Sequence, residues 1–205
     1  MTEARQGMSD AFVELDTAHP IWDQFYWVAP LVLVGTLEED GAHDLAPKHM
    51  ALPMGWENYF GFVCTPRHRT YHNAKRSGAF TVSYPRPEQL VPTSLAAAPR
   101  DEDGEKHSLA ALPVAPARVV DGVLLEGASV HLECRLHRVY DDFGVNSLVT
   151  GVVVRAVVDP RVERQPDRDD AQLLYRNPPL AYLHPGRFAV LQETQAFPFP
   201  AGMKK

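Results

Sequence analysis

The chain has few cysteines and no long apolar run, and both shortages limit what it can be. Only two cysteines occur among 205 residues, Cys64 and Cys134, so a disulfide framework is excluded and buried free thiols are expected. They do not form a C-x-x-C pair, which argues against a dithiol redox site. No apolar run is long enough to span a bilayer, and residues 1–16 lack the regions of a signal peptide. We therefore expect a cytoplasmic protein with no membrane partner.

An excess of positive charge is also missing. The formal net charge is −6 and the pI is about 5.8, which argues against a general affinity for nucleic acid. One stretch is a local exception, because it carries Arg67, His68, Arg69, His72, Lys75 and Arg76. An anionic small molecule suits such a local cluster better than a polyanion does.

Segments with the length and composition of β-strands dominate the chain. We expect strands at residues 30–37, 59–64, 79–83, 128–140, 148–158, 180–184 and 187–190. The run 30–37 is apolar on both faces, so it should be buried on both sides. Asp40-Gly41 and Pro185-Gly186 are turn signals. Because these strands follow one another without long helices between them, a mainly β fold with an antiparallel barrel is favoured over a βαβ fold.

For two of these predicted strands, the sequence also indicates which side chains are buried and where the backbone is irregular. Residues 128–140 alternate with a period of two, which places apolar Val130, Leu132, Cys134 and Leu136 on one face. The other face carries His131, Glu133, Arg135 and His137 and should be exposed. Gly151 inside the apolar strand 148–158 indicates a bulge or a close backbone approach. We expect the three tryptophans in the core or at an interface, namely Trp22, Trp27 and Trp56.

Helices are predicted to be short. Residues 70–77 form a two-turn helix that ends at Gly78, residues 106–112 form another, and helical starts occur near residues 87 and 94. Residues 101–105 read as a solvated acidic turn. The length fits one domain over residues 1–205, with an N-terminal arm (1–20), a barrel (21–190) and a C-terminal tail (191–205).

A polar segment and a basic segment lie on either side of the aromatic strand 59–64. Asp44 to His49 is predicted as an extended loop, and Pro47 limits its flexibility. The basic segment opens the helix that starts at Thr70. Cations, a hydroxyl group and the free amides of a helix start suit a phosphate-bearing ligand.

Plainer readings of the same residues stay open. The basic segment can be a solvated helix start, the loop can be an ordinary surface loop, and Asn73 can cap or brace the helix. His68 and His72 have the i, i+4 spacing of a metal site, but no acidic third ligand is near them in sequence. No nucleophile-elbow motif supports Ser-His-Asp catalysis.

The order and spacing of several segments resemble one family, the flavin reductase-like group of FMN-binding split barrels, over roughly residues 28 to 190. The matching segments are Val34-Gly35-Thr36, the Asp44–His49 segment with its Ala-Pro core, Arg67 to Asn73, Gly78 to Val82, Leu132-Glu133-Cys134, Gly151-Val152-Val153 and Tyr182 to Phe188.

The resemblance implies a Greek-key antiparallel split barrel that binds FMN. It also implies a homodimer with flavin sites at the interface, and an oxidoreductase that passes electrons from NAD(P)H to flavin or to a downstream acceptor. The FMN-binding residues that the motifs indicate are Asp44, Leu45, Ala46, Pro47, Lys48, His49, Arg67, Arg69, Thr70 and Asn73. A flavin carries the chemistry itself, so no catalytic side chain is required.

The chain departs from the family pattern at five positions that bear on function. Asp44 replaces the usual Asn, His49 replaces Ser, Arg69 replaces an acidic residue, Asn146 stands where many members have His, and Val152 replaces an acidic residue after the strand Gly. Asn146 and Val152 favour an alternative, an FMN-binding electron carrier or flavin-holding protein with little NAD(P)H activity. A split barrel that has lost flavin is a third reading.

Overall fold

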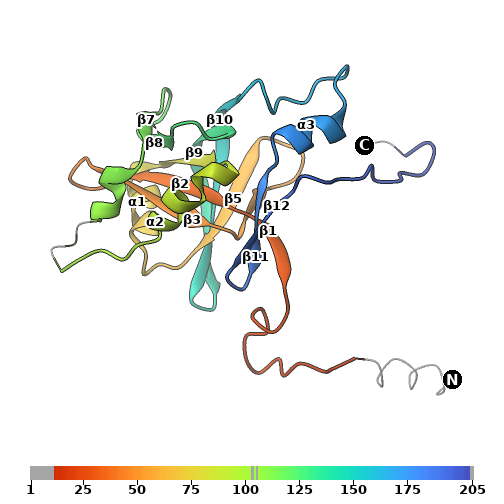
Figure 1. Cartoon of the computed structure of the whole chain (residues 1–205). Helices are drawn as coiled ribbons and strands as arrows, with labels where there is room; N and C mark the ends of the chain where they lie inside the picture. The colour runs from red at the N-terminus through yellow and green to blue at the C-terminus, as the bar shows by residue number, and fades with distance from the viewer. Residues whose placement is uncertain (1–11, 103, 105, 204–205) are drawn as a thin grey trace.

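The chain folds around one curled antiparallel sheet, which Figure 1 shows side-on. The computed structural model describes residues 12–102, 104 and 106–203. Seven strands lie in the order β3-β2-β6-β9-β10-β5-β4. Their bounds are β2 Val32–Leu37, β3 His43–Lys48, β4 Ala51–Pro53, β5 Tyr59–Cys64, β6 Ala79–Tyr84, β9 Val130–Phe143 and β10 Asn146–Val158. Because β2 pairs with β6 and β10 pairs with β5, the connections are of the Greek-key kind, and the mainly β prediction is confirmed.

The strand β2, second from the edge of the large sheet, is buried on both faces, as its composition predicted. Val32 and Val34 belong to one core cluster, together with Phe60, Phe62 and Phe80. Leu33 points the other way into a second cluster, which includes Leu45 and Leu125. Since alternate side chains of a strand face opposite sides, an all-apolar strand fits only where both sides are covered.

The interior of the sheet also confirms the expectations for Gly151 and the cysteines. The pairing of β9 with β10 shifts register between Thr150 and Gly151, and a Cβ atom at Gly151 would lie 2.6 Å from the ring of Phe80. Cys64 and Cys134 are free and buried. Burial raises the pKa of Cys134 to about 12, so its thiol is not poised for redox chemistry.

Helices are few and short. The helix α1 (Arg69–Ser77) ends as predicted at Gly78, whose φ of 68° needs no Cβ. The others are η1 (Pro87–Gln89), α2 (Leu90–Leu95), η2 (His107–Ala111) and α3 (Asp170–Arg176). The helix α3 was not predicted, although Asp169 caps it by accepting from the backbone N–H groups of residues 171 and 172. Among the described helices, none has the length and apolar character needed to cross a membrane.

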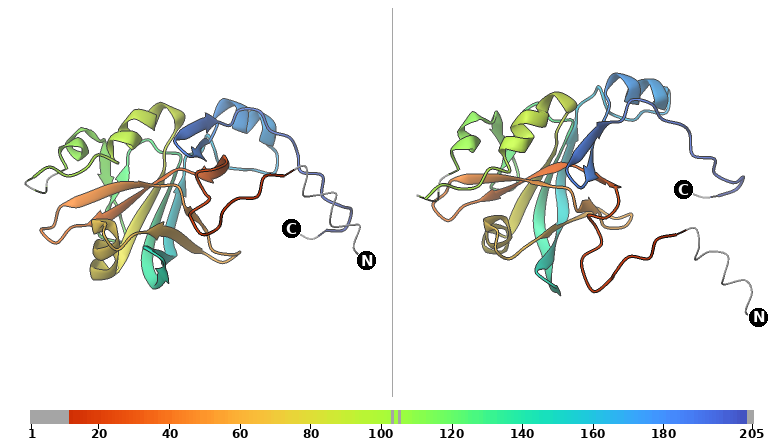
Figure 2. Two further views of the ribbon diagram at one scale, coloured as in Figure 1. Left: turned by 90° about the horizontal axis from the view of Figure 1, so that it is seen from below. Right: turned by 60° about the horizontal axis from the view of Figure 1, so that its bottom comes forward.

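A smaller sheet lies beside the large one and carries both ends of the described chain. It consists of β1 (Trp27–Pro30), β11 (Leu180–His184) and β12 (Arg187–Val190); a separate hairpin pairs β7 (Val114–Pro116) with β8 (Val123–Leu125). Residues 12–26, here the N-terminal segment, and residues 191–203, the C-terminal segment, contain no helix or strand. Figures 1 and 2 show both segments extending away from the sheets. The predicted division into arm, barrel and tail stays a prediction, and residues 1–11 and 204–205 lie outside the described part.

The segment predicted as a polar loop is a strand. Residues 43–48 form β3, which pairs with β2 in the register Thr36↔Asp44 and Val34↔Ala46. It is the end strand of the large sheet, and an edge strand tolerates Pro47 because one side of its backbone needs no partner. The tight turn at Gly41, with φ of 88°, folds β3 back onto β2.

The polar face predicted for residues 128–140 is only partly exposed. Glu133 is fully buried and accepts hydrogen bonds from the backbone N–H groups of residues 118, 119 and 120 and from Arg155. A loop after β7 therefore covers this face, which alternation alone could not reveal. Trp56 is not part of the core, because its side chain is fully exposed in the single chain; its place at an interface stays a prediction.

The buried carboxylate of Glu133 leads to a stability prediction. Burial by itself would raise the pKa of Glu133, but the backbone N–H groups and Arg155 outweigh it and lower the pKa. Glu133→Ala should reduce the free energy of unfolding by roughly 3 kcal/mol, because three N–H groups and a guanidinium lose their acceptor.

The contribution of Glu133 to the free energy of unfolding should be fully present at pH values above the ordinary pKa of a glutamate. It should be lost as the pH falls through the lower pKa that Glu133 has in the folded protein. Urea unfolding at several pH values measures it, with the exposed Glu57→Ala as the matched control. Equal stability of the Glu133 and Glu57 variants at neutral pH would contradict the proposed role.

Candidate functional site

One cavity of about 460 Å³ lies between the edge strand β3, the start of α1 and a third wall that includes Arg100 and Lys106. From β3 it is lined by Asp44, Ala46, Pro47 and Lys48, and from the helix start by Arg67, His68, Arg69 and Thr70. The third wall consists of residues 96–100 and Lys106. Its volume falls in the range of small-molecule sites, about 300–1,000 Å³.

Lys106 fastens the third wall to β3. Its ammonium group donates to Oδ1 of Asp44 at 3.1 Å and to the carbonyl oxygen of Leu45 at 2.9 Å. Both charged side chains are more than nine-tenths buried. A buried ion pair with an added backbone acceptor has the geometry that offsets part of the cost of desolvation, so Asp44 anchors the wall of the cavity.

A second buried carboxylate, Glu38, holds two arginines at the same place. Oε1 of Glu38 accepts from Arg100, and Oε2 accepts from Nη1 of Arg69 at 3.4 Å. Arg100 also lies 3.6 Å from Asp44. The positive charges of Arg100 and Arg69 are therefore partly compensated inside the protein.

Two other cations that line the cavity have no such compensation. Lys48 and Arg67 form no ion pair within the described part of the chain. No side chain caps the N-terminus of α1, and its first turn contains no acidic residue. Burial lowers the pKa of His68 at this helix start, Lys48 and Lys106 lower it further, and Asp44 opposes them. The region thus has a surplus of positive charge and free helix amides, which suits an anion.

Seven of the ten predicted site residues line this one cavity, and three face elsewhere. The side chain of Leu45 is buried in the second core cluster. Asn73 donates to Oγ1 of Thr36 at 3.2 Å and so braces α1 against β2. His49 turns toward the smaller sheet, where its ring stacks on His184 at 5.4 Å and lies 4.7 Å from that of Tyr182.

The structure also shows the surroundings of the predicted His68–His72 pair and of Asn146. His72 of the proposed i, i+4 pair is bound through Nε2 to the carbonyl of Pro66 at 2.7 Å. No group of three His, Cys, Asp or Glu residues suited to a metal occurs among the described residues. Asn146 opens β10 and lines a separate cavity of about 300 Å³, of which Arg67 also forms a wall.

Sequence reasoning missed the third wall, including Arg100 and Lys106. Both residues flank the acidic sequence 101–105, of which residues 103 and 105 lie outside the described part, and charges beside such a sequence ordinarily face water. Nothing local distinguishes them, because their partners Glu38 and Asp44 are more than 60 residues away, with separations of 62 in both cases.

The buried pair at the cavity allows a direct test by a double-mutant cycle. Lys106→Met and Asp44→Asn should each destabilise the fold, and together they should cost less than the sum. We expect a coupling free energy of about 1–3 kcal/mol from chemical denaturation. The exposed pair Arg164→Met with Asp170→Asn is the control, for which the coupling should stay below about 1 kcal/mol. Additive effects at the buried pair would show that Lys106 does not hold Asp44.

Solved structures with the same architecture are numerous, and three illustrate the likeness. Nitrilotriacetate monooxygenase component B from Bacillus cereus superposes with a TM-score of 0.79 at 19% identity, over 92% of this chain and 100% of that one. Flavoredoxin of Desulfovibrio vulgaris gives 0.74 at 19% identity, over 93% and 100%. The 2-nitrobenzoate 2-nitroreductase of Pseudomonas fluorescens gives 0.75 at 16% identity, over 96% and 97%. At these identities the likeness establishes the fold, a flavin reductase-type split barrel.

Sequence comparison adds a curated relative and a family. A protein of Methanothermobacter thermautotrophicus, described only as uncharacterized, is 27% identical over 116 residues, which is 55% of this chain. The match spans about half of that relative's length, 54%. The family model for the flavin reductase like domain matches residues 27–189, which is most of the chain and includes the whole cavity. The chain therefore belongs to the flavin reductase-like family.

Proposed function

We propose that the protein binds FMN in the cavity between β3, α1 and the third wall formed by residues 96–100 and Lys106. We further propose that it is an oxidoreductase passing electrons from NAD(P)H to flavin or to a downstream acceptor. The observation that carries the proposal is the pair of uncompensated cations, Lys48 and Arg67, beside an uncapped helix start. A phosphate dianion would supply the missing negative charge and accept hydrogen bonds from both side chains.

The residues of the cavity fit the rest of FMN as well. The outer edge of β3 has no neighbouring strand, so its backbone groups can meet the polar edge of the flavin ring. Ala46 and Pro47 give this wall an apolar surface, and Thr70, which lines the same cavity, would offer its hydroxyl group to the phosphate. A bound flavin supplies the electron and hydride chemistry, while the chain positions it and excludes water.

The proposal also covers the cellular location, the oligomeric state and the small-molecule partners of the protein. We place it in the cytoplasm, and as a homodimer with its flavin sites at the interface, as the family resemblance implies. Its small-molecule partners would be NAD(P)H and flavin, with no role in nucleic acid or membrane binding.

Asn146 supports a second candidate function. It lines a cavity that shares Arg67 with the proposed FMN site, at the position where many family members have His. An amide does not exchange a proton near neutral pH, whereas an imidazole does. This favours an FMN-binding electron carrier or flavin-holding protein with little NAD(P)H activity.

Flavin affinity tests the phosphate contact. Wild-type protein mixed with FMN should bind it, as followed by quenching of flavin fluorescence. Lys48→Ala and Arg67→Ala should each weaken FMN by roughly tenfold or more, the value of a charge-assisted hydrogen bond, and should leave the affinity for riboflavin nearly unchanged. Arg187→Ala removes an exposed arginine outside the cavity and serves as the control. If FMN and riboflavin weaken equally, these two cations do not bind the phosphate.

Anaerobic mixing with NADH or NADPH decides between the two candidate functions. We expect the flavin absorbance of the FMN-loaded protein to bleach on the timescale of turnover, as in a nicotinamide-dependent oxidoreductase. In Asn146→His the bleaching should be faster, because that variant provides an imidazole near the site. Bleaching by dithionite but not by either nicotinamide would instead establish the carrier.

A further inference from the structure

Side chains, rather than a hydrogen-bonded pair of strands, join the two larger sheets of the protein. In the described part of the chain, the smaller sheet β1-β11-β12 forms no ladder with the seven-stranded sheet. The ring of His49, which directly follows β3, packs against Trp27 of β1 at a centroid distance of 5.7 Å. It also packs against Tyr182 and His184 of β11, at 4.7 and 5.4 Å. These four side chains form a cluster between the sheets, here the aromatic junction.

Two ring nitrogens inside the aromatic junction lack a hydrogen-bond partner. Nε2 of His49 and Nδ1 of His184 are shielded from solvent, and neither has a partner among the described residues. A neutral imidazole tolerates this, because one of its nitrogens carries no proton. An imidazolium carries a proton on both nitrogens. A proton added to either ring would therefore create a buried donor without an acceptor, which costs free energy.

The charges around His49 also oppose its protonation. Its ring is nearly parallel to that of His184, with 18° between the planes, so two imidazoliums would repel each other at close range. Burial, His184 and Lys48 all lower the pKa of His49. The strands of the smaller sheet, and β4 that lies against β1, contain no Asp or Glu. Besides His184, their side chains with a polar or titratable group are the indole of Trp27, the phenol of Tyr182 and the exposed guanidinium of Arg187.

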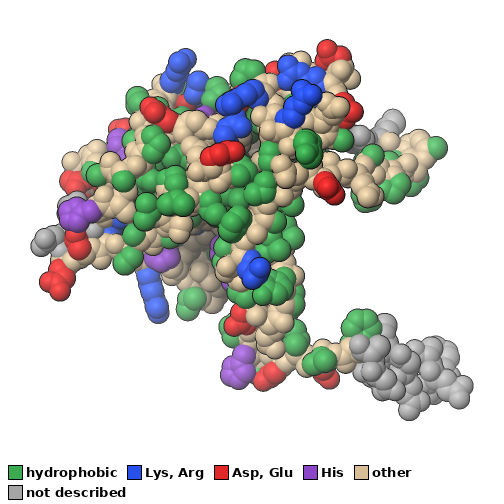
Figure 3. Space-filling model, in the orientation of Figure 1, with side chains coloured by type: hydrophobic (Ala, Val, Ile, Leu, Met, Phe, Trp, Pro, Cys, Tyr) green, Lys and Arg blue, Asp and Glu red, His purple; other side chains and the backbone are tan. Residues whose placement is uncertain are grey.

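The aromatic junction lies directly beside the candidate site. His49 follows Lys48, the last residue of β3, which lines the cavity together with Ala46 and Pro47. Because β3 is an edge strand, its ladder with β2 supports it on one side only. Figure 3 shows hydrophobic side chains along the smaller sheet, and such side chains favour packing over exposure to water. The contact at His49 thus supports the end of the strand that forms one wall of the cavity.

We infer that the aromatic junction is an acid-sensitive contact: uptake of a proton by His49 separates the smaller sheet from the end of β3, while the seven-stranded sheet stays folded. The contact should be fully formed above pH 6.5, the ordinary pKa of histidine. It should be lost as the pH falls through the lower pKa that His49 has in the folded protein. At still lower pH, the ratio of separated to joined protein should be raised tenfold for each unit by which the joined state lowers that pKa.

The emission of Trp27 tests the inference without any ligand. In a chain with Trp22→Phe and Trp56→Phe, Trp27 is the remaining one of the three tryptophans, and it is partly buried. From about pH 8 to about pH 5, the range in which histidine changes charge, its emission maximum should move to longer wavelength. Its quenching by acrylamide should rise, and the far-UV circular dichroism should stay constant. Emission intensity is not the readout, because an imidazolium quenches a neighbouring indole by contact alone.

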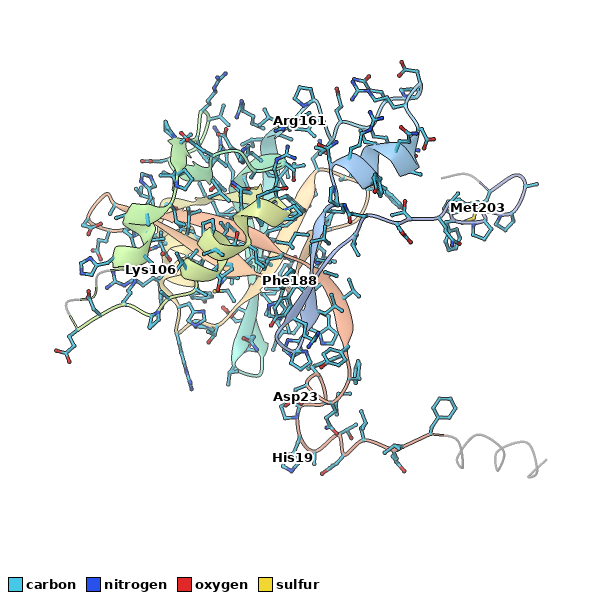
Figure 4. The ribbon with its side chains drawn as sticks, viewed as in Figure 1. His19, Asp23, Lys106, Arg161, Phe188 and Met203 are labelled. Carbon is cyan, nitrogen blue, oxygen red and sulfur yellow. The ribbon has the colours of Figure 1, made fainter. Side chains whose placement is uncertain are left out.

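Variants of His49 in the same chain assign the change to the aromatic junction. His49→Phe and His49→Gln cannot take up a proton, so the emission maximum should not move with pH. His49→Arg is always charged, so its emission should be shifted already at the high-pH end. His19→Gln is the matched control and should behave like the parent chain. The side chain of His19 is 78% exposed, and Figure 4 shows it well apart from Phe188 of the smaller sheet.

Three results would each overturn the inference. The first is an emission maximum of Trp27 that does not move with pH in the parent chain. The second is a movement that persists in a folded His49→Phe or His49→Gln chain. The third is a His49→Arg chain whose emission matches that of the parent at the high-pH end.

Flavin affinity shows whether the separation reaches the cavity, and this part rests on the proposed function. Riboflavin is the probe, because the phosphate group of FMN itself titrates at about pH 6. The affinity of the wild type for riboflavin should fall roughly tenfold over the titration, and that of His49→Phe should stay constant. Equal losses in the two proteins would contradict a link between His49 and the cavity. If no flavin binds at any pH, the proposed function fails, and the emission of Trp27 alone decides the inference.

Discussion

Two buried carboxylates on one hairpin hold the functional region of this protein together. Glu38 and Asp44 lie at facing ends of β2 and β3, and between them they bind Arg69, Arg100 and Lys106. These pairs hold Arg100 and Lys106, which belong to the third wall of the cavity, against the edge of the large sheet. Burying a carboxylate is costly unless cations are paired with it, so the wall of the cavity and the charge balance of its interior depend on each other.

The same pairs divide the cations of the site into two groups. Arg100, Lys106 and Arg69 are paired with carboxylates of the chain, whereas Lys48 and Arg67 keep their charge available at the cavity. This division gives a physical meaning to Asp44, which stands where the family usually has Asn. A carboxylate at this position can fix a lysine from a distant segment, which an amide could do only with a weaker, uncharged acceptor.

His49, another departure from the family pattern, connects the cavity to the smaller sheet. Its ring packs against Trp27 of β1 and against Tyr182 and His184 of β11. Burial, His184 and Lys48 all lower its pKa, in that order of effect, so the neutral imidazole is favoured. His49, which directly follows β3, thus packs the smaller sheet against the strand that lines the cavity.

The sequence by itself determined the strands of the core, the antiparallel architecture, the helix that ends at Gly78, the free buried cysteines and the family. These features depend on local signals, such as two-sided apolar runs, turn residues and motif spacing. Seven of the residues that line the cavity were also predicted from the sequence. Only the tertiary structure decided that residues 43–48 pair as an edge strand, that Glu133 is covered, and that His49 and Asn73 face away from the cavity. Only the tertiary structure identified Arg100 and Lys106 as residues of the site. Their partners Glu38 and Asp44 are distant in sequence, and folding brings these buried carboxylates to them.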